Sequence, residues 1–268
     1  MDEDLRPSLA TLDRTRSSPA RVYDCLLGGR HHLAVDRALV ARLVDRMPQL
    51  PTIMRTNRQF LRRAVSTVAA LGVSQFLDLG SGLPTAGNVH EVARRVNPSA
   101  RVASVDIDPD AVYQSRAILG DDPASCALQA DLLDARRVLT APCVRGVIDF
   151  GQPVAILLIF SGHFVADTIA LWRALITYRR AAAPGSYLVL SHGTTEARPT
   201  EIAELVRIYA ESGATLTARS RIELTRLLDG WDVIDPGLVY TPEWRPDGEA
   251  PVDAVGGYCT LAVVARKA

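Results

Sequence analysis

The chain has 268 residues, enough to bury a full hydrophobic core as one large domain, alone or with an extension. Its 30 basic and 30 acidic side chains cancel, which gives no reason to expect nucleic acid or an anionic membrane as a partner, because both attract basic surfaces. No apolar run approaches the roughly 20 residues that cross a bilayer, and the acidic start of the chain is not a signal peptide, so we expect a cytoplasmic protein.

The first part of the chain carries no strand candidate. Residues 1–18 are polar and contain proline and serine, which predicts a flexible arm. Residues 19–71 show apolar side chains at helical spacing, interrupted at Gly28 and Gly29, and a third helix is predicted over residues 52–70. We expect residues 19–71 to form a helical extension that precedes the main domain.

Short apolar runs alternate with helical segments through most of residues 72–268. This alternation predicts a domain built on a parallel sheet that is covered by helices on both faces. Five strands are predicted here: Gln75–Leu79, Arg101–Val105, Ser125–Gln129, Pro153–Phe160 and Ser186–Ser191. Right-handed crossovers favour a doubly wound arrangement of these strands.

The end of the chain differs in character. Helices are predicted over residues 199–212 and 220–228. Two strands are predicted after them, Trp231–Leu238 and Tyr258–Val264, separated by a loop rich in proline and glycine. This arrangement suits an antiparallel pair that closes the sheet.

A glycine-rich stretch, QFLDLGSGLPTAGNVHE at residues 75–91, begins with the first predicted strand. Gly80, Gly82 and Gly87 let the backbone turn sharply, leave N–H groups uncovered and let a ligand approach without a Cβ in the way. The alternative is a strand-to-helix turn that needs positive φ. A dinucleotide fingerprint would also require glycine at position 85, where this chain has Thr85, so the loop departs from the nicotinamide-cofactor pattern.

Two carboxylates end the next two predicted strands. Asp106 can accept hydrogen bonds from both ribose hydroxyls of a nucleoside-containing cofactor. Its alternative role, a helix cap, is better filled by Asp108, which precedes Pro109. Asp131 can accept a hydrogen bond from an adenine amino group while Leu132 covers the ring, or it can cap the helix that follows, and both roles stay open.

His163 follows the fourth predicted strand, at the sheet edge where open α/β folds bind ligands. An imidazole with an ordinary pKa of about 6.5 is suited to take a proton from a hydroxyl or a protonated amine. His163 is therefore the first candidate for a catalytic residue, and His192, which follows the fifth strand, is the second. The alternative is that His163 caps the following helix or positions a loop.

No metal site is expected. The five histidines lack HxxxH or HxH spacing and the four cysteines form no CxxC pair, although His31 and His32 together with His163 stay open as a ligand set. The scattered cysteines also argue against a disulfide framework. We expect all four to be buried free thiols: Cys25, Cys126, Cys143 and Cys259.

The segment FLDLGSGLPT, with Asp106 and Asp131 after the next two strands, resembles motifs I to III of class I S-adenosylmethionine-dependent methyltransferases. More narrowly, the chain is similar to the bacterial S-adenosyl methyltransferase family, long treated as a domain of unknown function. The segments that carry this likeness are PARVYDCLLGGRHHLAVDR, TNRQFLRRAV, FLDLGSGLPTAGNVHEVA, HFV and APGSYLVLSH. The resemblance runs from about Pro19 to the C-terminus. It implies an α/β, Rossmann-like fold with a doubly wound seven-stranded sheet of order 3-2-1-4-5-7-6.

The resemblance also assigns residues to the cofactor S-adenosyl-L-methionine, which has no phosphate and asks less of a glycine loop. Gly80, Ser81 and Gly82 would lie against its methionine part, and Asp78 would anchor its ammonium group. Arg58 would bind its carboxylate through a bidentate contact, unless it belongs to a solvated helix face. The complete predicted cofactor site is Arg58, Asp78, Gly80, Ser81, Gly82, Thr85, Asp106, Ile107, Asp131 and Leu132.

The N-terminal extension is expected to form a lid over the cofactor and the acceptor. The predicted lid residues are Tyr23, Gly28, Gly29, His31 and His32. Members of the family commonly read GGKDNF where this chain reads GGRHHL. Two imidazoles in place of an acidic–amide pair indicate either a specialised substrate or a tolerant loop.

These observations predict a methyltransferase that acts on a small molecule by in-line transfer and releases S-adenosyl-L-homocysteine. Two competing hypotheses keep the same pocket: an enzyme that uses it for another reaction, such as a cyclisation, and a non-catalytic regulatory protein. A nicotinamide oxidoreductase is the most distant alternative. No nucleic-acid or membrane partner is expected, and a homodimer stays open.

Overall fold

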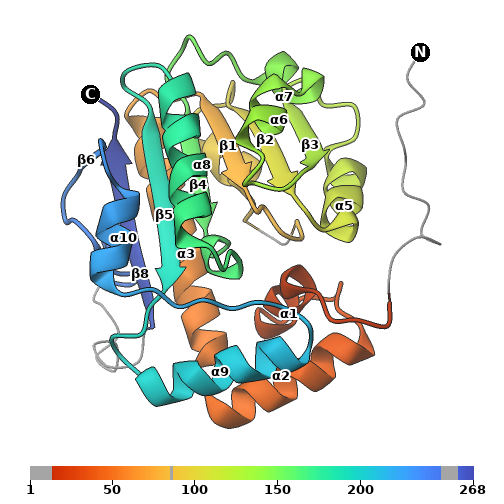
Figure 1. Ribbon diagram of the computed structural model, residues 1–268. Coiled ribbons are helices and arrows are strands. Elements are labelled where there is room, and N and C mark those ends of the chain that lie inside the picture. The colour runs from red at the N-terminus through yellow and green to blue at the C-terminus, as the bar shows by residue number, and fades with distance from the viewer. Residues whose placement is uncertain (1–13, 85–86, 249–258) are drawn as a thin grey trace.

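The computed structural model describes residues 14–84, 87–248 and 259–268. Figure 1 shows a central sheet flanked by helices, with further helices beyond the lower ends of its parallel strands. The helices are α1 (Pro19–Leu26), α2 (Ala34–Arg46), α3 (Leu50–Ala70), α4 (Val89–Val96), α5 (Pro109–Leu119), α6 (Ala135–Thr140), α7 (Pro142–Val147), the 3-10 helix η2 (Gly162–Phe164), α8 (Thr168–Ala181), α9 (Pro199–Glu211) and α10 (Arg221–Leu227). The strands are β1 (Gln75–Leu79), β2 (Arg101–Asp106), β3 (Ser125–Gln129), β4 (Ala155–Ile159), β5 (Tyr187–Gly193), β6 (Asp232–Val233), β7 (Val239–Tyr240) and β8 (Thr260–Arg266). None of these helices combines the length and the apolar character that crossing a membrane requires.

The described sheet has the strand order β3-β2-β1-β4-β5-β8-β6, with β7 paired to β8. Strands β1 to β5 are parallel to their neighbours, whereas β8 runs antiparallel to β5. In the expected order 3-2-1-4-5-7-6, β8 takes the place of the seventh strand and β6 that of the sixth. The predicted fold class and strand order are therefore confirmed, but the described sheet has eight strands instead of seven, because β7 adds a further short strand beside β8.

One predicted strand is wrong. Only β6, two residues long, lies in the segment Trp231–Leu238, because a turn follows it and the two-residue strand β7 begins after Leu238. Pro236 has no N–H for a strand ladder, and Gly237 has a φ of 96°, which an extended strand excludes. The last predicted strand is shifted to Thr260–Arg266, and Tyr258 lies outside the described residues.

The four cysteines are free, as predicted, but they are not all buried. Cys259 is buried, Cys25 and Cys126 are half-buried, and Cys143 is exposed. Cys143 lies in the first turn of the short helix α7 at the surface. The prediction of four buried thiols is therefore wrong in this respect.

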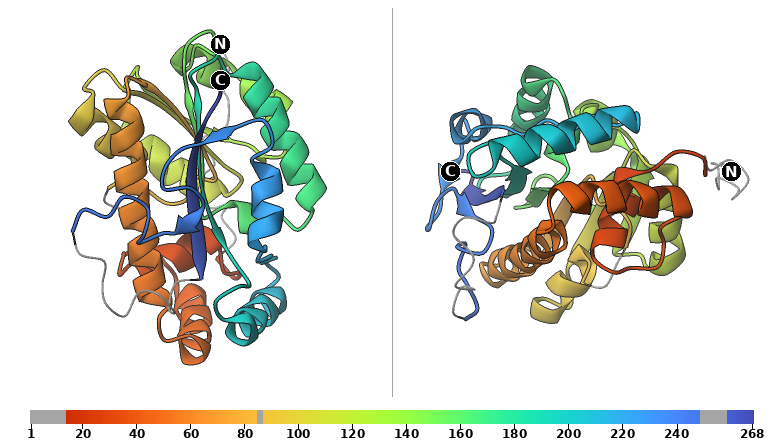
Figure 2. Two further views of the ribbon diagram at one scale, coloured as in Figure 1. Left: turned by 90° about the vertical axis from the view of Figure 1, so that its left-hand side faces the viewer. Right: turned by 90° about the horizontal axis from the view of Figure 1, so that it is seen from below.

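Two apolar layers cover the sheet. On one face, α6, α7, α8 and α10 pack against strand side chains such as Leu79 and Leu158. On the other face, α3 and α4 pack against side chains such as Phe76 and Val189. Figure 2 shows α3 and α8 on opposite sides of the sheet. Because β4 is covered on both faces, its sequence is an unbroken apolar run, whereas the equally buried β1 also contains Gln75 and Asp78.

A third apolar cluster lies beyond the carboxyl ends of the parallel strands. It joins α1, α2, the first half of α3 and α9 through side chains such as Leu43, Ile53 and Leu205. α2 and α9 lie against each other there, as Figure 2 shows from below. Farther along α3, Phe60 and the apolar residues after it pack on the sheet. The predicted helical extension is thus anchored in the sheet layer through α3.

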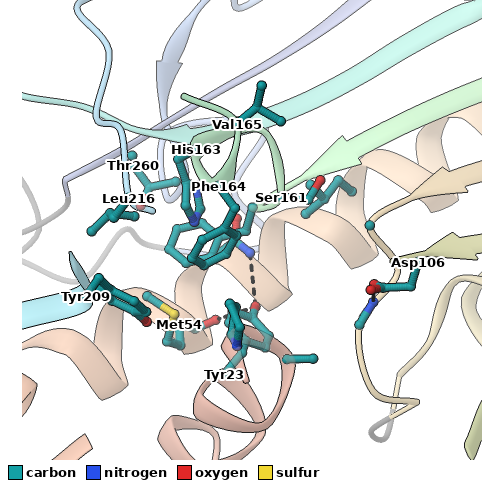
Figure 3. Close-up of a pocket in the computed structure, with 18 of the residues that line it drawn as sticks. Tyr23, Met54, Asp106, Ser161, His163, Phe164, Val165, Tyr209, Leu216 and Thr260 are labelled. Atoms are coloured by element: carbon teal, nitrogen blue, oxygen red, sulfur yellow. Dashed lines mark hydrogen bonds between the residues drawn. The ribbon is translucent and has the colours of Figure 1, made fainter. Parts of the chain in front are cut away.

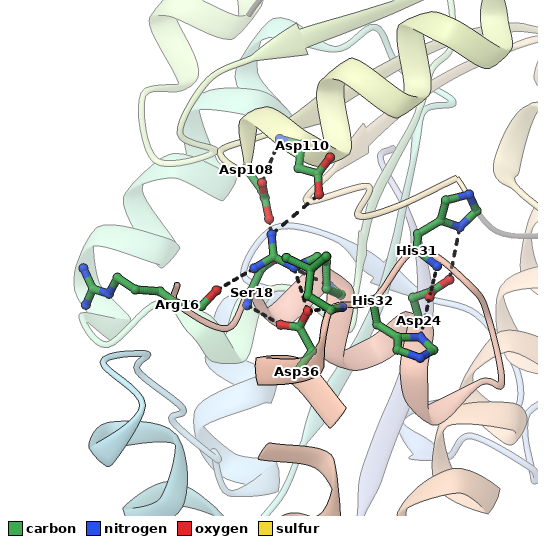
Figure 4. A network of polar contacts seen from close by, with 10 residues as sticks. Arg16, Ser18, Asp24, His31, His32, Asp36, Asp108 and Asp110 are labelled. Carbon is green, nitrogen blue, oxygen red and sulfur yellow. Dashed lines mark hydrogen bonds and ion pairs between the residues drawn. The ribbon is translucent and has the colours of Figure 1, made fainter. Parts of the chain in front are cut away.

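A buried network of ion pairs and hydrogen bonds docks α1 and α2 on the loop after β2 (Figure 4). The Nε of Arg21 donates to Asp36 Oδ2 at 2.8 Å, and its Nη1 lies 3.5 Å from Asp110 Oδ2 at the start of α5. Ser18, the N-cap of α1, donates through its hydroxyl to Asp108 Oδ2. Its N–H donates to Asp36 Oδ1 at 3.1 Å. The helical extension is therefore held by the same loop that follows Asp106.

The predicted flexible arm is docked where the structure describes it. Residues 1–13 of the arm lie outside the described residues. The carbonyl oxygen of Arg16 accepts a hydrogen bond from Arg21 at 2.6 Å, and Ser18 is buried. Residues 16–18 therefore belong to the network that holds α1.

We expect Arg21→Ala to lower the free energy of unfolding by about 3 kcal/mol, because removing one partner leaves the buried Asp36 carboxylate without its cation. Urea denaturation followed by circular dichroism measures the change. Arg42→Ala is the matched control, since Arg42 joins α2 to α9 through a pair with Glu211 at the surface, where such pairs contribute little. Equal losses in the two variants would contradict a special role for the buried network.

Candidate functional site

A cavity of about 530 Å³ lies between the carboxyl ends of β1 to β4 and the helices α1, α2, α3 and α9. Strand loops contribute to its walls within residues 80–83, 106–108, 130–133 and 159–167, and side chains from the helices complete them. Open α/β sheets bind ligands at this edge. Figure 3 shows Asp106 on one side of the cavity and Tyr209 on the other.

The loop after β1 requires glycine at position 80. Gly80 has a φ of 74°, and a Cβ there would lie 2.4 Å from the Cβ of Ser161 on the loop after β4. The Ser161 hydroxyl in turn donates to the Leu79 carbonyl oxygen at 2.7 Å. Close contact between these two loops therefore shapes the floor of the cavity. The predicted cofactor residue Thr85 lies outside the described residues.

The N–H groups at the start of this loop, from Gly80 to Gly82, are not uncovered, and for them the prediction is wrong. Gly80 and Ser81 donate to the carbonyl oxygen of Val105 on β2, at 2.7 and 3.1 Å. Gly82 donates to Asp106 Oδ2 at 2.7 Å. The glycines therefore serve the close approach of the chain, and polar recognition of a ligand falls to side chains.

Two buried carboxylates, Asp78 and Asp106, line the cavity, each with a side chain that is mostly withdrawn from solvent. Asp106 accepts backbone hydrogen bonds from Gly82 and, at 2.9 Å, from Asp108. Burial raises the pKa of Asp106, against the lowering effect of these hydrogen bonds. Burial also raises the pKa of Asp78 to about 7, while Arg58 opposes the rise. A ligand that brings a cation or hydrogen-bond donors would stabilise both carboxylates in their charged form.

Asp131 lies exposed at the cavity wall, and its Oδ1 accepts a hydrogen bond from the N–H of Leu133 at 2.8 Å. It closes a turn, because the cap of the following helix α6 is Asp134. Asp131 therefore does not cap α6, and a hydrogen bond to an adenine amino group stays as its predicted role. Ile107, 66% exposed, and Leu132 also line this part of the cavity and offer apolar surface to a flat ring.

His163 lies on η2, directly after β4, and lines the cavity with 1% of its surface exposed. Its Nδ1 is buried and has no hydrogen-bond partner within the described part of the chain. Burial, reinforced by the charges of His192 and Arg219, lowers the pKa of His163 well below its ordinary value. The imidazole is therefore neutral near pH 7 and a weaker base than an unperturbed histidine. Nearby, Phe160 has a φ of 57°, an uncommon conformation for a non-glycine residue that concentrates at functional sites.

Arg219 is not among the residues predicted from the sequence, yet its fully buried guanidinium holds the loop that carries His163. It donates to the carbonyl oxygens of Gly162 at 3.0 Å and Val165 at 2.7 Å. It also donates to Nε2 of His192 at 2.8 Å. No motif marks Arg219, which precedes α10 among ordinary polar residues, and only the fold brings it to this loop.

His192 does not line the cavity. Its side chain is fully buried, Nδ1–H donates to the carbonyl oxygen of Gly193 at 2.7 Å, and Nε2 accepts from Arg219. Burial lowers the pKa of His192 to about 4. Because both ring nitrogens are engaged, the structure gives His192 a positioning role and offers no support for catalysis by it.

A second network fixes α1 over the cavity. The Tyr23 hydroxyl accepts a hydrogen bond from Asn57 Nδ2 at 3.0 Å, and the Ser191 hydroxyl donates to Asn57 Oδ1 at 2.6 Å. These bonds connect α1, α3 and β5. The guanidinium of Arg58, which also lines the cavity, lies 5.5 Å from the centre of the Tyr23 ring. Arg58 therefore faces the site and is not part of a purely solvated helix face.

The other predicted lid residues do not line the cavity: Gly28, Gly29, His31 and His32. Gly28 has a φ of 79° and donates its N–H to the carbonyl oxygen of Cys25 at the end of α1. The other three surround Asp24, since a Cβ at Gly29 would lie 1.9 Å from Asp24 Oδ1, and the N–H of His31 donates to Asp24 Oδ2 at 2.9 Å. His32 Nδ1 lies 3.3 Å from the same oxygen. The prediction that they contact substrate is corrected to a structural role around a buried carboxylate. No set of three or more metal-ligating side chains forms in the described residues, which removes the histidine ligand set left open above.

Comparisons with known proteins point to one family. The family described as S-adenosyl methyltransferase matches residues 6–268. A Thermobifida fusca protein described as a candidate methyltransferase is 40% identical, with 98% of this chain and 99% of that chain covered and a TM-score of 0.90. A DUF574 family protein from Streptomyces avermitilis is 33% identical, with 96% and 99% covered and a TM-score of 0.88. No curated protein matches the chain.

We expect Arg219→Ala to lower the free energy of unfolding by about 3 kcal/mol, because it leaves buried carbonyl oxygens and the His192 nitrogen without donors. Thermal and urea denaturation measure this loss. Arg207→Ala serves as the control, since Arg207 is exposed on α9 and pairs with glutamates of its own helix. An Arg219→Ala protein as stable as the control would show that the guanidinium does not hold the loop.

Proposed function

Because the chain belongs to the S-adenosyl methyltransferase family, we propose that it transfers a methyl group in line to a small-molecule acceptor held beneath α1, α2 and α9. Membership of this family makes the protein an S-adenosylmethionine-dependent methyltransferase, which confirms the expected family, activity and cofactor. The observation that carries the proposal is a single cavity that runs from the loops after β1, β2 and β3 into the part enclosed by α1, α2, α3 and α9. We call this enclosed part the chamber. Such a cavity can hold both reactants at reacting distance.

The residues at the sheet edge fit the cofactor. Asp106 keeps lone pairs beyond its two backbone hydrogen bonds, and these can accept the ribose hydroxyls. Asp78 would bind the ammonium group and Arg58 the carboxylate, since both line the same part of the cavity. Ile107 and Leu132 would cover the adenine ring. S-adenosyl-L-methionine bound there supplies a methyl group that its positively charged sulfur makes electrophilic.

The chain's own contribution to the transfer is alignment and the exclusion of water. Tyr23 is fixed through Asn57 to β5, and the loop that carries His163 is fixed by Arg219. The walls between these points are mainly apolar side chains of α2, α3 and α9. An acceptor in this chamber is therefore held by rigid elements and shielded from bulk water.

We expect Asp106→Ala to weaken S-adenosyl-L-homocysteine binding by about 100-fold in titration calorimetry, because two charge-assisted hydrogen bonds to ribose are lost. Asp122→Ala is the control, since Asp122 is a partly buried carboxylate paired with Arg94 beside β3 but away from the cavity. Incubation with methyl-labelled cofactor and a metabolite extract then tests transfer. Binding without label in any small product would contradict methyl transfer and favour a bystander or regulatory use of the cofactor.

The raised pKa of Asp78 predicts a pH dependence of cofactor binding. In the free protein the neutral carboxyl is favoured below about pH 7, whereas an ammonium group binds the ionised form. Affinity for S-adenosyl-L-homocysteine should therefore rise by up to about tenfold per pH unit between roughly pH 5 and 7, and flatten above. The stability of the free fold changes in the opposite direction, because ionisation of Asp78 disfavours the folded state as the pH rises through 7. Asp78→Asn should reduce the pH dependence of both the binding affinity and the free energy of unfolding. If both pH dependences were unchanged in that variant, Asp78 would be excluded as the titrating group.

A further inference from the structure

We propose that the acceptor is an uncharged, planar aromatic molecule with one hydroxyl or ring N–H group, and that this group binds at His163. The inference rests on the proposed function, because it concerns the acceptor part of the same cavity. Two independent observations carry it. Aromatic rings form a row along the cavity, and the helices that enclose the chamber contribute almost no charge.

Five rings from three parts of the chain form this row. The ring centre of Tyr23 on α1 lies 5.6 Å from that of Phe160, which lies 4.3 Å from that of His163. His163 lies 4.4 Å from Phe164, and Phe164 lies 5.9 Å from Tyr209 on α9. All five residues line the cavity, and Figure 3 shows Phe164 beside His163 on the loop after β4. Tilted and edge-on rings at these distances offer faces and edges against which a further flat ring packs favourably.

Most of the charges on the described cavity wall lie on the cofactor side. Arg58 is the one charged residue that α1, α2, α3 and α9 add to the described walls. It lies over the Tyr23 ring and acts electrostatically on Asp78, which assigns it to the cofactor. Of the remaining charged wall residues, four lie on β1, on β2 and on the loops after β2 and β3, and the fifth lies on the loop after β4, where it is exposed and caps α8: Asp78, Asp106, Asp108, Asp131 and Asp167.

A charged acceptor would therefore leave water without finding a counter-ion in the chamber. The side chains it would meet include Leu43, Met54, Ile202 and Leu205. A saturated molecule of the same size would bury similar apolar area but would forgo the contacts with the row of rings. The chamber thus favours an aromatic over both a charged and a saturated acceptor.

His163 provides the polar contact that such an acceptor needs. Its imidazole is neutral, stands in the middle of the row and carries a buried Nδ1 without a partner in the described residues. A donated O–H or N–H hydrogen bond to the accepting ring nitrogen would fix the acceptor atom beside the loop after β4. An unpaired buried polar atom is costly, so a donor at this place is stabilising.

The transfer needs no reactant beyond the acceptor and the cofactor, with His163 as the proton acceptor. The acceptor oxygen or nitrogen forms a bond to the methyl carbon as the carbon–sulfur bond breaks, and the electron pair of that bond stays on sulfur. The proton of the acceptor passes to His163, which releases it to solvent. Because this proton becomes strongly acidic once the acceptor atom carries the methyl group, a weak base is sufficient. The lowered basicity of His163 is therefore compatible with the role.

The test uses the full-length protein saturated with S-adenosyl-L-homocysteine and four probes that share one fused two-ring carbon skeleton. Titration calorimetry compares 2-naphthol with 2-naphthoate, 2-naphthylmethylammonium and decahydro-2-naphthol. We expect 2-naphthol to bind at least about 10-fold more tightly than each of the others. Equal or tighter binding of the anionic, cationic or saturated probe would overturn the assignment of acceptor class.

Variants test the two contacts separately. Phe164→Leu should weaken 2-naphthol binding by about 10-fold while leaving decahydro-2-naphthol nearly unchanged, because it removes a ring and keeps apolar volume. Phe150→Leu is the matched control, since Phe150 is a buried ring outside the cavity. In the wild type, 2-naphthol should bind about fivefold more tightly than 2-methoxynaphthalene, which cannot donate. His163→Leu should abolish that preference, and a preference that survives would show that His163 does not receive the donor.

Failure of this inference is distinguishable from failure of the proposed function. Titration with S-adenosyl-L-homocysteine alone reports the cofactor site, and the labelled-extract experiment reports transfer to any small molecule. If both succeed while 2-naphthol shows no preference, only the acceptor class is wrong. If the cofactor does not bind, the proposed function itself fails.

Discussion

The placement of the loop after β4 depends on one buried guanidinium. A charged group in the interior is costly, because its hydration is lost, and it is tolerated only when its donors are satisfied. Arg219 meets this condition through two carbonyl oxygens of the loop after β4, the Thr168 hydroxyl and the imidazole of His192. Each partner belongs to an element that must be in place before the arginine can be buried. The loop, the start of α8 and the end of β5 are therefore fixed together, and the ring of His163 has little freedom to leave the cavity wall.

The rest of the site is assembled against this fixed point from two directions. From the sheet side, the contact between Gly80 and Ser161 brings the first strand loop against the same loop. From the helical side, Tyr23 is tied through Asn57 to Ser191 on β5. The Arg21 network then connects α1 to the loop that follows Asp106. The cofactor side and the acceptor side are thus mechanically joined although their residues are far apart in the sequence.

Local patterns predicted the parts of the molecule that local forces determine. Each parallel strand carries a short group of apolar residues, and β1 and β3 were predicted with the observed bounds and β2 within one residue. The motif carboxylates Asp78, Asp106 and Asp131 reach the cavity because the carboxyl ends of neighbouring parallel strands meet at one edge.

Residues whose roles arise from tertiary contact were missed or misassigned. Arg219 has no motif, His31 and His32 turn to the buried Asp24, and His192 is held by Arg219. The turn at Pro236 and Gly237 also escaped the strand pattern, since apolar residues flank it on both sides.

The division of the cavity has a consequence for how such enzymes diversify. The residues assigned to the cofactor are Arg58 and residues in the segment from β1 to the loop after β3. The chamber walls come largely from α1, α2, the first half of α3, α9 and residues 216–218. Substitutions in these helices at positions other than Arg58 can reshape the chamber without altering a side chain that is assigned to the cofactor. An ancestral fold of this kind can therefore acquire new acceptors while its chemistry stays constant, and selection can act on the two halves at different rates.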